Sequence, residues 1–314
     1  MEIIKVDHLT KTYKNGVQAL DDLFLTVKTG EVFTLLGKNG SGKSTLINIL
    51  TTFLTPTSGN VTIFNKDIRK GAAEIRKQIG CVAQSPSIDR YLSLEQNLIF
   101  QSKIYKVPMK EAQNRMKQLI KCFELEAYTQ YPTSTYSGGV KRRLDIALSM
   151  MSHPKMIFLD EPTVGMDIQS RMAMWKMIKQ IKEEFGTTVF LTTHYLEEAD
   201  ELSDTICIMK DGKNMIQGTT QELRKFLNEE RIEIQFASNK EVQNSFKLLE
   251  KELSNGNIHE NKIITCNEKG KMQIKNITQI LLKNNISFQG ISRVQPTLED
   301  IYLRYTSDGE KKVM

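Results

Sequence analysis

The stretch GKNGSGKS at residues 37–44 has the spacing of a phosphate-binding loop, and a short apolar run at residues 33–36 precedes it. Its three glycines let the backbone turn tightly and aim its N–H groups at phosphate oxygens. An amphipathic segment follows from about Lys43, so a helix N-terminus would add the positive end of its dipole. A strand before this loop and a helix after it are the context that identifies a P-loop. We therefore predict that the chain binds a nucleoside triphosphate.

The polar side chains of this loop have expected partners on the nucleotide. Lys43 would reach the β- and γ-phosphates, and Ser44 would supply a hydroxyl to Mg²⁺. We therefore expect a nucleoside triphosphate and Mg²⁺ as the ligands of this loop; the family resemblance given below implies that the nucleotide is ATP. The nucleotide-binding residues predicted in and next to the loop are Gly37, Asn39, Gly40, Ser41, Gly42, Lys43, Ser44 and Thr45.

The composition is that of an ordinary globular protein, with 39% hydrophobic and 25% charged residues. The net charge of +6 is spread along the chain. The basic cluster at residues 141–143 is far shorter than a nucleic-acid-binding tail, so we expect no nucleic-acid partner. Residues 1–7 lack a signal-peptide pattern, and no apolar run approaches the ~18 residues of a spanning helix. A function at a membrane would therefore be performed from the water side.

Hydrophobic periodicity predicts two domains, at residues 1–226 and 227–314. Residues 2–9 and 21–28 alternate between apolar and polar and predict an N-terminal antiparallel sheet. Further strands are expected at 61–64, 79–83, 156–159 and 188–192, and helices at 94–125 (broken near Pro108), from 138 to 151 and at 168–185. Strands that alternate with helices predict a mostly parallel α/β core with an added helical subdomain.

The pattern of apolar and polar residues changes near Phe226. From there we predict a strand (231–237), a helix (239–253), a strand (262–266), a short strand (near 271–274), a helix (276–284), a strand (287–294) and a helix (297–305). This succession indicates a small α+β module of ferredoxin-like topology.

Two acids follow the apolar run at 156–159 directly. A buried parallel strand would place Asp160 beside the P-loop, where its carboxylate can hold Mg²⁺ through water. Glu161 would then be placed to polarise the attacking water as a general base. The alternative is an acidic turn that caps a helix, but a P-loop upstream in the same chain favours catalysis.

The run YSGGV at residues 136–140 resembles the Leu-Ser-Gly-Gly-Gln signature of the ATP-binding subunits of ABC transporters. Ser137, Gly138 and Gly139 match this signature, whereas Tyr136 and Val140 depart from it. Tyrosine at the first position is common in the drug-exporter branch of that family, and Val140 removes a side-chain amide but leaves the backbone donors. Physically, Ser137 would cap a helix that starts at Gly138 and leave free N–H groups for a γ-phosphate.

The resemblance implies further site residues, in the order expected for the family, over residues 1 to about 220. Gln84 matches the glutamine that senses Mg²⁺ and the γ-phosphate, and Asp167 matches the D-loop aspartate. His194 matches the switch histidine that contacts the γ-phosphate, and Tyr13 matches the aromatic residue that stacks on adenine. A structural alternative for Tyr13 is a solvent-facing strand tyrosine. With these matches, the implied catalytic residues are Glu161, His194 and Gln84, and the implied Mg²⁺ ligands are Ser44, Gln84 and Asp160.

In the family that this chain resembles, two subunits sandwich two ATP molecules head to tail. The signature Ser137–Gly139 would therefore act in trans, on the nucleotide of the opposite subunit, in a homodimer or a heterodimer. ATP would thereby cross-link the subunits, and hydrolysis would release them.

Two segments resemble the exporter branch. One is 192–200, which contains the switch histidine, and the other is the helix predicted at 297–303, which contains Leu-Glu-Asp. The resemblance implies a separate transmembrane permease subunit, docked near residues 85–97 at the cytoplasmic face of the membrane. An importer ATPase is the first alternative, although importers often carry β-rich C-terminal barrels. A soluble ABC ATPase acting on ribosomes or DNA is the second. Ribosome-acting members of this class usually carry two ATPase cassettes, whereas this chain has one. DNA-repair members carry a long insertion between the P-loop and the acid pair, which this chain lacks.

Overall fold

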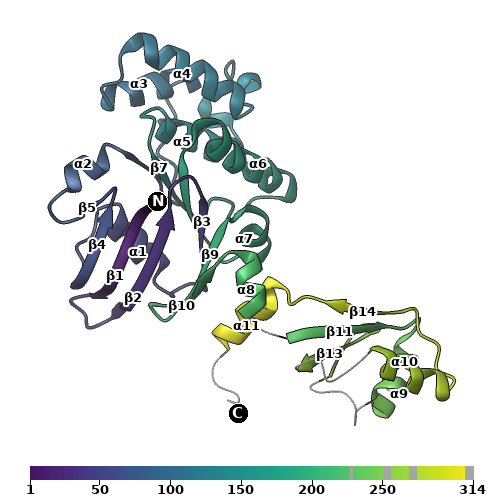
Figure 1. Cartoon of the computed structure of the whole chain (residues 1–314). Helices are drawn as coiled ribbons and strands as arrows, with labels where there is room; N and C mark the ends of the chain where they lie inside the picture. Colours follow the sequence, from purple (N-terminus) through teal and green to yellow (C-terminus); the bar gives the residue numbers. More distant parts are fainter. Residues whose placement is uncertain (227–228, 250–255, 269–273, 308–314) are drawn as a thin grey trace. The chain divides into compact units, whose positions relative to one another are not determined.

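The computed structural model describes residues 1–226, 229–249, 256–268 and 274–307 (Figure 1). It divides into two compact units, Met1–Thr220 and Gln221–Met314. The domain boundary predicted between residues 226 and 227 lies after helix α8 (Thr220–Phe226), and it stays a prediction.

An antiparallel sheet opens the first unit, with the strand order β2-β1-β4-β5. Inward residues such as Ile4, Val6 and Leu25 are buried, and they alternate with exposed ones as a half-buried strand requires. The predicted strands 2–9 and 21–28 are confirmed, and both run further than predicted. The bounds are β1 (Glu2–Thr12), β2 (Gln18–Lys28), β4 (Ser58–Ile63) and β5 (Lys66–Asp67).

The central sheet of the first unit has six strands in the order β10-β9-β3-β8-β7-β6. All neighbouring strands are parallel except β10, which pairs antiparallel with β9. Its core strands are apolar on both faces: Phe158 and Phe190 pack into one cluster, while Leu159 and Leu191 pack into another. The bounds are β3 (Val32–Leu36), β6 (Ile79–Val82), β7 (Met156–Asp160), β8 (Thr188–Thr193), β9 (Thr205–Lys210) and β10 (Lys213–Gly218).

Seven α-helices are assigned within residues 1–219, and α3 and α4 form the predicted helical subdomain (Figure 1). Ser93 and Gln96 form a capping box at the start of α3, and Pro108 separates α3 from α4 where the break was predicted. The predicted helix 168–185 is confirmed at both ends. The bounds are α1 (Lys43–Leu50), α2 (Ala72–Arg76), α3 (Leu94–Ile104), α4 (Met109–Cys122), α5 (Gly138–Met150), α6 (Ile168–Phe185) and α7 (Leu196–Leu202).

The second unit holds a four-stranded antiparallel sheet in the order β12-β13-β11-β14. Its element succession is the β-α-β-β-α-β of the ferredoxin-like motif, followed by a last helix. Apolar residues from β11, β13, α9 and α10 form its core. The bounds are β11 (Glu229–Gln235), α9 (Asn239–Leu249), β12 (Asn257–His259), β13 (Lys262–Glu268), α10 (Ile274–Lys283), β14 (Gly290–Val294) and α11 (Leu298–Thr306).

The structure contains the strands predicted at 231–237, 262–266 and 287–294 and the helices predicted at 239–253, 276–284 and 297–305, with shifted bounds; the first of these helices is described as far as residue 249. The hairpin partner of the strand at 262–268 is β12, which precedes it in the chain and for which the sequence predicts no strand. The sequence predicts a short strand near 271–274. Residues 271–273 lie outside the described residues, and Ile274 begins α10.

Candidate functional site

The P-loop connects β3 to α1, as its flanking sequence predicted. Gly42 precedes the helix with φ +104°, and a Cβ atom at this position would lie 2.5 Å from the Ala19 carbonyl oxygen. At Gly37 a Cβ atom would lie 2.6 Å from the Met209 carbonyl oxygen. Because real Cβ atoms do not approach backbone oxygens so closely, only glycine fits at both positions. The loop therefore keeps its tight path close to neighbouring backbone.

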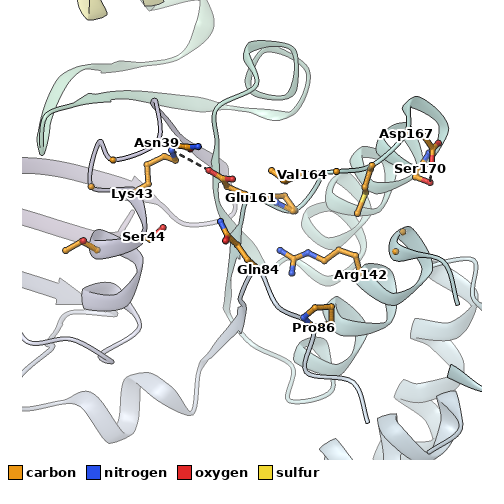
Figure 2. Close-up of a pocket in the computed structure, with 18 of the residues that line it drawn as sticks. Asn39, Lys43, Ser44, Gln84, Pro86, Arg142, Glu161, Val164, Asp167 and Ser170 are labelled. Carbon is orange, nitrogen blue, oxygen red and sulfur yellow. Dashed lines mark hydrogen bonds and ion pairs between the residues drawn. The ribbon is translucent and has the colours of Figure 1, made fainter. Parts of the chain in front are cut away.

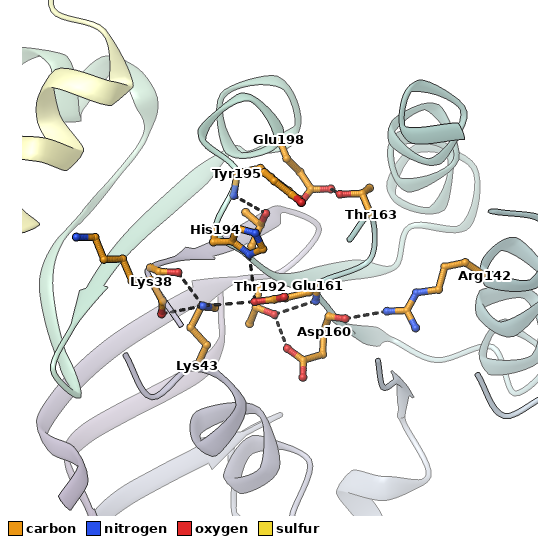
Figure 3. A network of polar contacts seen from close by, with 12 residues as sticks. Lys38, Lys43, Arg142, Asp160, Glu161, Thr163, Thr192, His194, Tyr195 and Glu198 are labelled. Carbon is orange, nitrogen blue, oxygen red and sulfur yellow. Dashed lines mark hydrogen bonds and ion pairs between the residues drawn. The ribbon is translucent and has the colours of Figure 1, made fainter. Parts of the chain in front are cut away.

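Lys43 is the buried cation of this loop, with its side chain 5% exposed. Its Nζ donates to the carbonyl oxygens of Gly37 (2.7 Å) and Lys38 (3.1 Å) (Figure 3). The same Nζ lies 3.5 Å from Oε1 of Glu161. The ammonium group is thus held inside the loop, where its positive charge faces a carboxylate.

Glu161 follows the last residue of β7 and adopts φ +46°, a left-handed conformation that a non-glycine residue seldom takes. Its backbone N–H donates to Thr192 Oγ1 (3.1 Å). Its carboxylate is 10% exposed, and Oε1 also lies 3.4 Å from Nδ1 of His194. One carboxylate oxygen therefore faces both Lys43 and His194, at a backbone position under strain.

Asp160 and Thr192 are neighbours because β7 and β8 pair in parallel, with these two residues in register. Thr192 Oγ1 donates to Asp160 Oδ1 at 2.6 Å and accepts the hydrogen bond from the Glu161 N–H. Thr192 thereby orients both acids. Sequence reasoning placed this threonine in a strand but gave it no role, because the register between the strands was unknown.

Arg142 is a second residue that sequence reasoning missed. It belongs to the basic cluster at residues 141–143, but its side chain is buried, with 5% exposed. Its guanidinium donates to the carbonyl oxygens of Ala83 and Asp160 and lies 3.7 Å from Asp145. Burial lowers the pKa of Arg142, and Asp145 opposes this shift. Arg142 therefore connects the end of β6 to the end of β7 through hydrogen bonds, and one of these bonds is to the residue directly before Gln84. The place of Arg142 one helical turn before Asp145 and Ile146, which are buried on α5, was the available signal.

A polar cavity of about 770 Å³ lies between the P-loop and the start of α5 (Figure 2). It gathers most of the predicted site residues, from segments far apart in the sequence. These are Asn39, Gly40, Gly42, Lys43, Ser44, Thr45, Gln84, Ser137, Gly138, Gly139, Glu161 and Asp167. The remaining predicted residues, Tyr13, Gly37, Ser41, Asp160 and His194, are not in its lining. The volume suits a ligand of nucleotide size.

Tyr13 is connected to this cavity through Thr45. Its hydroxyl lies 3.1 Å from Thr45 Oγ1, and the Lys11 ammonium lies 5.5 Å from the centre of its ring. The ring is 38% exposed. Its predicted contact with adenine stays a prediction.

Ser137 caps α5, as predicted: its Oγ accepts from the Val140 N–H at 3.4 Å. Because the backbone of Val140 makes this bond, the departure from glutamine at that position leaves the cap intact. Asp167 caps α6 by accepting from the Ser170 N–H (2.9 Å) and the Ser170 hydroxyl (2.8 Å). These bonds lower the pKa of Asp167. A Cβ atom on Gly139 would lie 3.1 Å from Ser170 Oγ, so the signature and the D-loop pack closely.

The predicted Mg²⁺ ligands have suitable chemistry. Ser44, Gln84 and Asp160 supply hydroxyl, amide and carboxylate oxygens, which are the donors that Mg²⁺ prefers. Within the residues that the structure describes, no group of three His, Cys, Asp or Glu side chains is arranged to hold a metal ion.

Glu198 on α7 is a buried acid that sequence reasoning did not single out. Its Oε1 accepts from Thr163 Oγ1 at 2.8 Å (Figure 3). The same oxygen accepts from Trp175 Nε1 at 3.3 Å. Burial raises the pKa of Glu198. The carboxyl group thus connects the helix after His194 to the segment after Glu161 and to α6. Its place on the same helical face as Ala199 and Leu202 was the signal of burial.

In the described part of the chain, no helix combines the length and the apolar character needed to cross a membrane.

Comparisons with known proteins identify the family of this chain. A family model described as ABC transporter matches residues 20–164. The daunorubicin resistance ATP-binding protein DrrA3 of Streptomyces coeruleorubidus is 32% identical over 310 residues, which cover 98% of this chain and 97% of that protein.

Two solved structures are similar as well. One is cbiO1 from Clostridium perfringens, described as part of the ABC transporter complex cbiONQ, with a TM-score of 0.66 and 32% identity over 72% of this chain and 94% of the other. The second is a dimeric, post-hydrolysis state of the ATP-binding cassette MJ0796 bound to ADP and Pi. Its TM-score is 0.61 and its identity 29%, over 69% of this chain and 98% of the other. The chain therefore belongs to the ATP-binding subunits of the ABC transporter family and is an ATPase of that family.

Proposed function

We propose that this chain is the ATP-hydrolysing subunit of an exporter and drives a separate membrane subunit from the cytoplasmic face of the membrane. The relatives named for daunorubicin and doxorubicin resistance support export of drug-like molecules. The mixed helix and strand of the second unit differ from the β-rich barrel expected of many importers. The membrane subunit selects the transported molecule.

The observation that carries the catalytic proposal is the position of Glu161 Oε1, 3.5 Å from Lys43 Nζ and 3.4 Å from His194 Nδ1. Glu161 accepts a proton from water as the water oxygen bonds to the γ-phosphorus and the bond to the bridging oxygen of ADP breaks. Lys43 exchanges its carbonyl partners for phosphate oxygens when ATP binds. Lys43 and His194 then stabilise the charge of the γ-phosphoryl group.

Ser44, Gln84 and Asp160 are the residues that would hold Mg²⁺. When bound, the cation neutralises charge on the β- and γ-phosphates. Thr192 keeps the Asp160 carboxylate in place through its 2.6 Å hydrogen bond. Gln84 follows β6, and Arg142 holds the end of this strand through its hydrogen bond to the Ala83 carbonyl. The backbone of Gln84 is therefore fixed next to the site.

We also propose that two subunits enclose ATP, with Ser137, Gly138 and Gly139 of one subunit acting on the nucleotide of the other. The dimeric MJ0796 structures support this arrangement. The N–H groups of Gly138 and Gly139 at the start of α5 have no intrahelical partners by geometry, so they can bind a γ-phosphate presented to them.

The first test is Glu161→Gln, with phosphate release and ATP binding measured on the same preparation. We expect ATP binding to persist and turnover to fall by roughly 100-fold or more, since general-base catalysis contributes about that factor. Glu201→Gln is the matched control, because Glu201 is an exposed acid on α7 that pairs with Lys179. Unchanged turnover in Glu161→Gln would remove this residue from the role of base.

The same variant tests the partner. Tagged Glu161→Gln protein with Mg-ATP should recover a multi-span membrane protein from detergent-solubilised membranes. Recovery of ribosomes or DNA-bound complexes without a membrane protein would contradict the proposal that the chain is an exporter subunit.

A mixture of two inactive variants tests the action in trans. Lys43→Ala removes phosphate binding and Ser137→Arg blocks the signature. Mixed dimers then contain one site with an intact Lys43 and an intact Ser137 from the other subunit. We expect the mixture to hydrolyse more ATP than either variant alone. A mixture as inactive as its components would mean that the signature acts within its own subunit.

A further inference from the structure

Glu198 is a fully buried acid without a role in the proposed phosphate chemistry. Its side chain on α7 is 0% exposed, and the two residues that donate to its Oε1, Thr163 and Trp175, are neutral. Hydrogen bonds from neutral donors return only part of the free energy that a carboxyl group loses on burial, so a residue that only filled space here would be apolar. The positions of the two donors indicate what the carboxyl group does.

The first donor lies directly after the proposed base. Thr163 is two residues beyond Glu161 and 1% exposed, and its hydroxyl donates to Glu198 Oε1 at 2.8 Å (Figure 3). At the start of this segment, the Glu161 N–H donates to Thr192 Oγ1. Glu161 thus lies between two fixed points. Its φ of +46° is a strained conformation, which persists only where neighbouring groups hold it.

The carboxyl group itself belongs to the side of the site that carries the switch histidine. Glu198 lies four residues after His194, on α7. Thr193, directly before the histidine, accepts the Tyr195 N–H on its hydroxyl (3.0 Å) and the Gly37 N–H on its carbonyl (3.2 Å). The start of α7 is therefore fixed to the P-loop, and Glu198 extends from this helix to the segment that follows the proposed base.

Helix α6 forms the third side of this connection. Trp175 Nε1 donates to the same Glu198 Oε1 at 3.3 Å. One turn earlier on α6, the Arg171 guanidinium lies 5.2 Å from the centre of the Tyr195 ring. Two successive turns of α6 therefore contact α7 and the residue after His194, and Glu198 makes the buried one of these contacts.

We propose that Glu198 is a positioning residue of the ATPase reaction, which keeps Glu161 and His194 facing each other. Its Oε1 holds the segment after Glu161 against the helix after His194, so the two side chains cannot move apart. Glu161 Oε1 lies 3.4 Å from His194 Nδ1. A displacement of about 1 Å near a reacting centre can lower a rate by about 100-fold. The inference rests on the proposed roles of Glu161 and His194 in ATP hydrolysis.

The experiment compares Glu198→Leu with Glu198→Gln in steady-state phosphate release by the full chain over a range of ATP concentrations. Leucine has a similar volume but accepts no hydrogen bond, whereas glutamine keeps an oxygen acceptor. We expect Glu198→Leu to lower kcat by roughly 10- to 100-fold and to change KM for ATP by less than about twofold, because phosphate binding by the P-loop does not use this oxygen. Glu198→Gln should keep kcat within about threefold of the wild type.

Thr163→Val removes the same hydrogen bond from its other end and leaves Glu198 in place. Valine and threonine have similar volumes, so this variant tests the proposal even if Glu198→Leu does not fold. We expect a loss of kcat comparable to that of Glu198→Leu. Because both changes break one hydrogen bond, the double variant should lose no more kcat than the more impaired single variant.

Trp175 supplies a readout that is independent of turnover, since it is the only tryptophan of the chain. Its fluorescence emission maximum should shift in Glu198→Leu and stay at the wild-type value in Glu198→Gln. Ile181→Val is the matched control for lost stability, because Ile181 is buried on α6 and belongs to the core rather than to this connection. It should leave both kcat and the emission maximum unchanged.

Two outcomes would overturn the proposal. One is an unchanged kcat in Glu198→Leu or Thr163→Val protein that urea unfolding shows to be folded. The other is losses of kcat that add up in the double variant, since the two residues would then act separately. A large loss in Glu161→Gln together with an unchanged kcat in Glu198→Leu would keep the proposed base and remove only the positioning role.

Discussion

Two of the three sheets in the described residues use their strands in opposite ways. In the six-stranded sheet the parallel core strands are buried on both faces, and their ends bring Asp160, Glu161 and His194 next to the P-loop. The four-stranded antiparallel sheet of the second unit alternates: Ile232 and Ile234 are buried, whereas Gln235 between Ile234 and Phe236 is exposed. A parallel sheet gathers distant residues at one edge because its strands all end there. The comparison shows why chemistry is concentrated in one unit.

The largest expected effect is that of Lys43→Ala. Removing the buried ammonium should weaken ATP binding and reduce hydrolysis by roughly 1,000-fold, because phosphate charge is then left uncompensated in the loop. Equilibrium binding of a fluorescent ATP analogue and phosphate release measure the two effects. Lys38→Ala is the control, since the Lys38 side chain is exposed and only its carbonyl contacts Lys43. Unaltered ATP affinity in Lys43→Ala would contradict the phosphate role.

Arg142→Ala probes the connection between the ends of β6 and β7. We expect a loss of about 3–5 kcal/mol in the free energy of unfolding, because Asp145 would keep a buried, uncompensated charge. Urea unfolding of the variant and of Lys141→Ala, its neighbour on α5, would measure this loss. A destabilisation no greater than that of Lys141→Ala would show that the buried pair is not needed for stability.

Ile234→Ala tests whether the second unit is energetically separate. Removing a buried side chain from its small core should cost about 2–5 kcal/mol of the stability of that unit. ATP hydrolysis by the first unit should stay within twofold of the wild type. Gln235→Ala, on the exposed face of the same strand, should change neither quantity. A parallel loss of ATPase activity in Ile234→Ala would show that the units are coupled.

The smallest effect concerns Glu198, whose burial raises its pKa. Because the folded-state pKa lies above that of the unfolded chain, its contribution to stability is complete below the ordinary glutamate range. That contribution is lost as pH rises from there through the raised pKa, with a slope of at most about 1.4 kcal/mol per pH unit. Glu198→Gln should remove this part of the pH dependence while it keeps an acceptor for Thr163. Denaturant unfolding of wild type and variant between pH 4 and 8 measures the difference, with exposed Glu197→Gln as the control.

Much of the site could be predicted from the sequence because its motifs are local. The P-loop, the acid pair and the Ser137 cap each depend on residues that are adjacent in the chain, and their flanking elements have clear periodicity. Arg142 and Thr192 could not be assigned in this way. Their partners, Ala83 and Asp160, are distant in sequence. The register of β7 and β8 brings Thr192 to Asp160, and the packing of α5 beside the ends of β6 and β7 brings Arg142 to Ala83 and Asp160.

In the second unit, too, only a part of the topology could be predicted from the sequence. Its succession of elements followed from hydrophobic patterns, but the pairing of its hairpin did not. The three-residue strand β12 is too short for a periodic signal, and it is recognised only through its pairing with β13.

By itself, the sequence of this protein determined its phosphate-binding chemistry, its acid pair, its alternating α/β order and its family resemblance, because each resides in contiguous residues. Only the tertiary structure decided that Glu161 Oε1 faces Lys43 and His194 together, that Arg142 is buried, and that Glu198 connects three segments near the site. These features depend on strand register and on burial. Both are set by packing between parts of the chain that no local pattern relates.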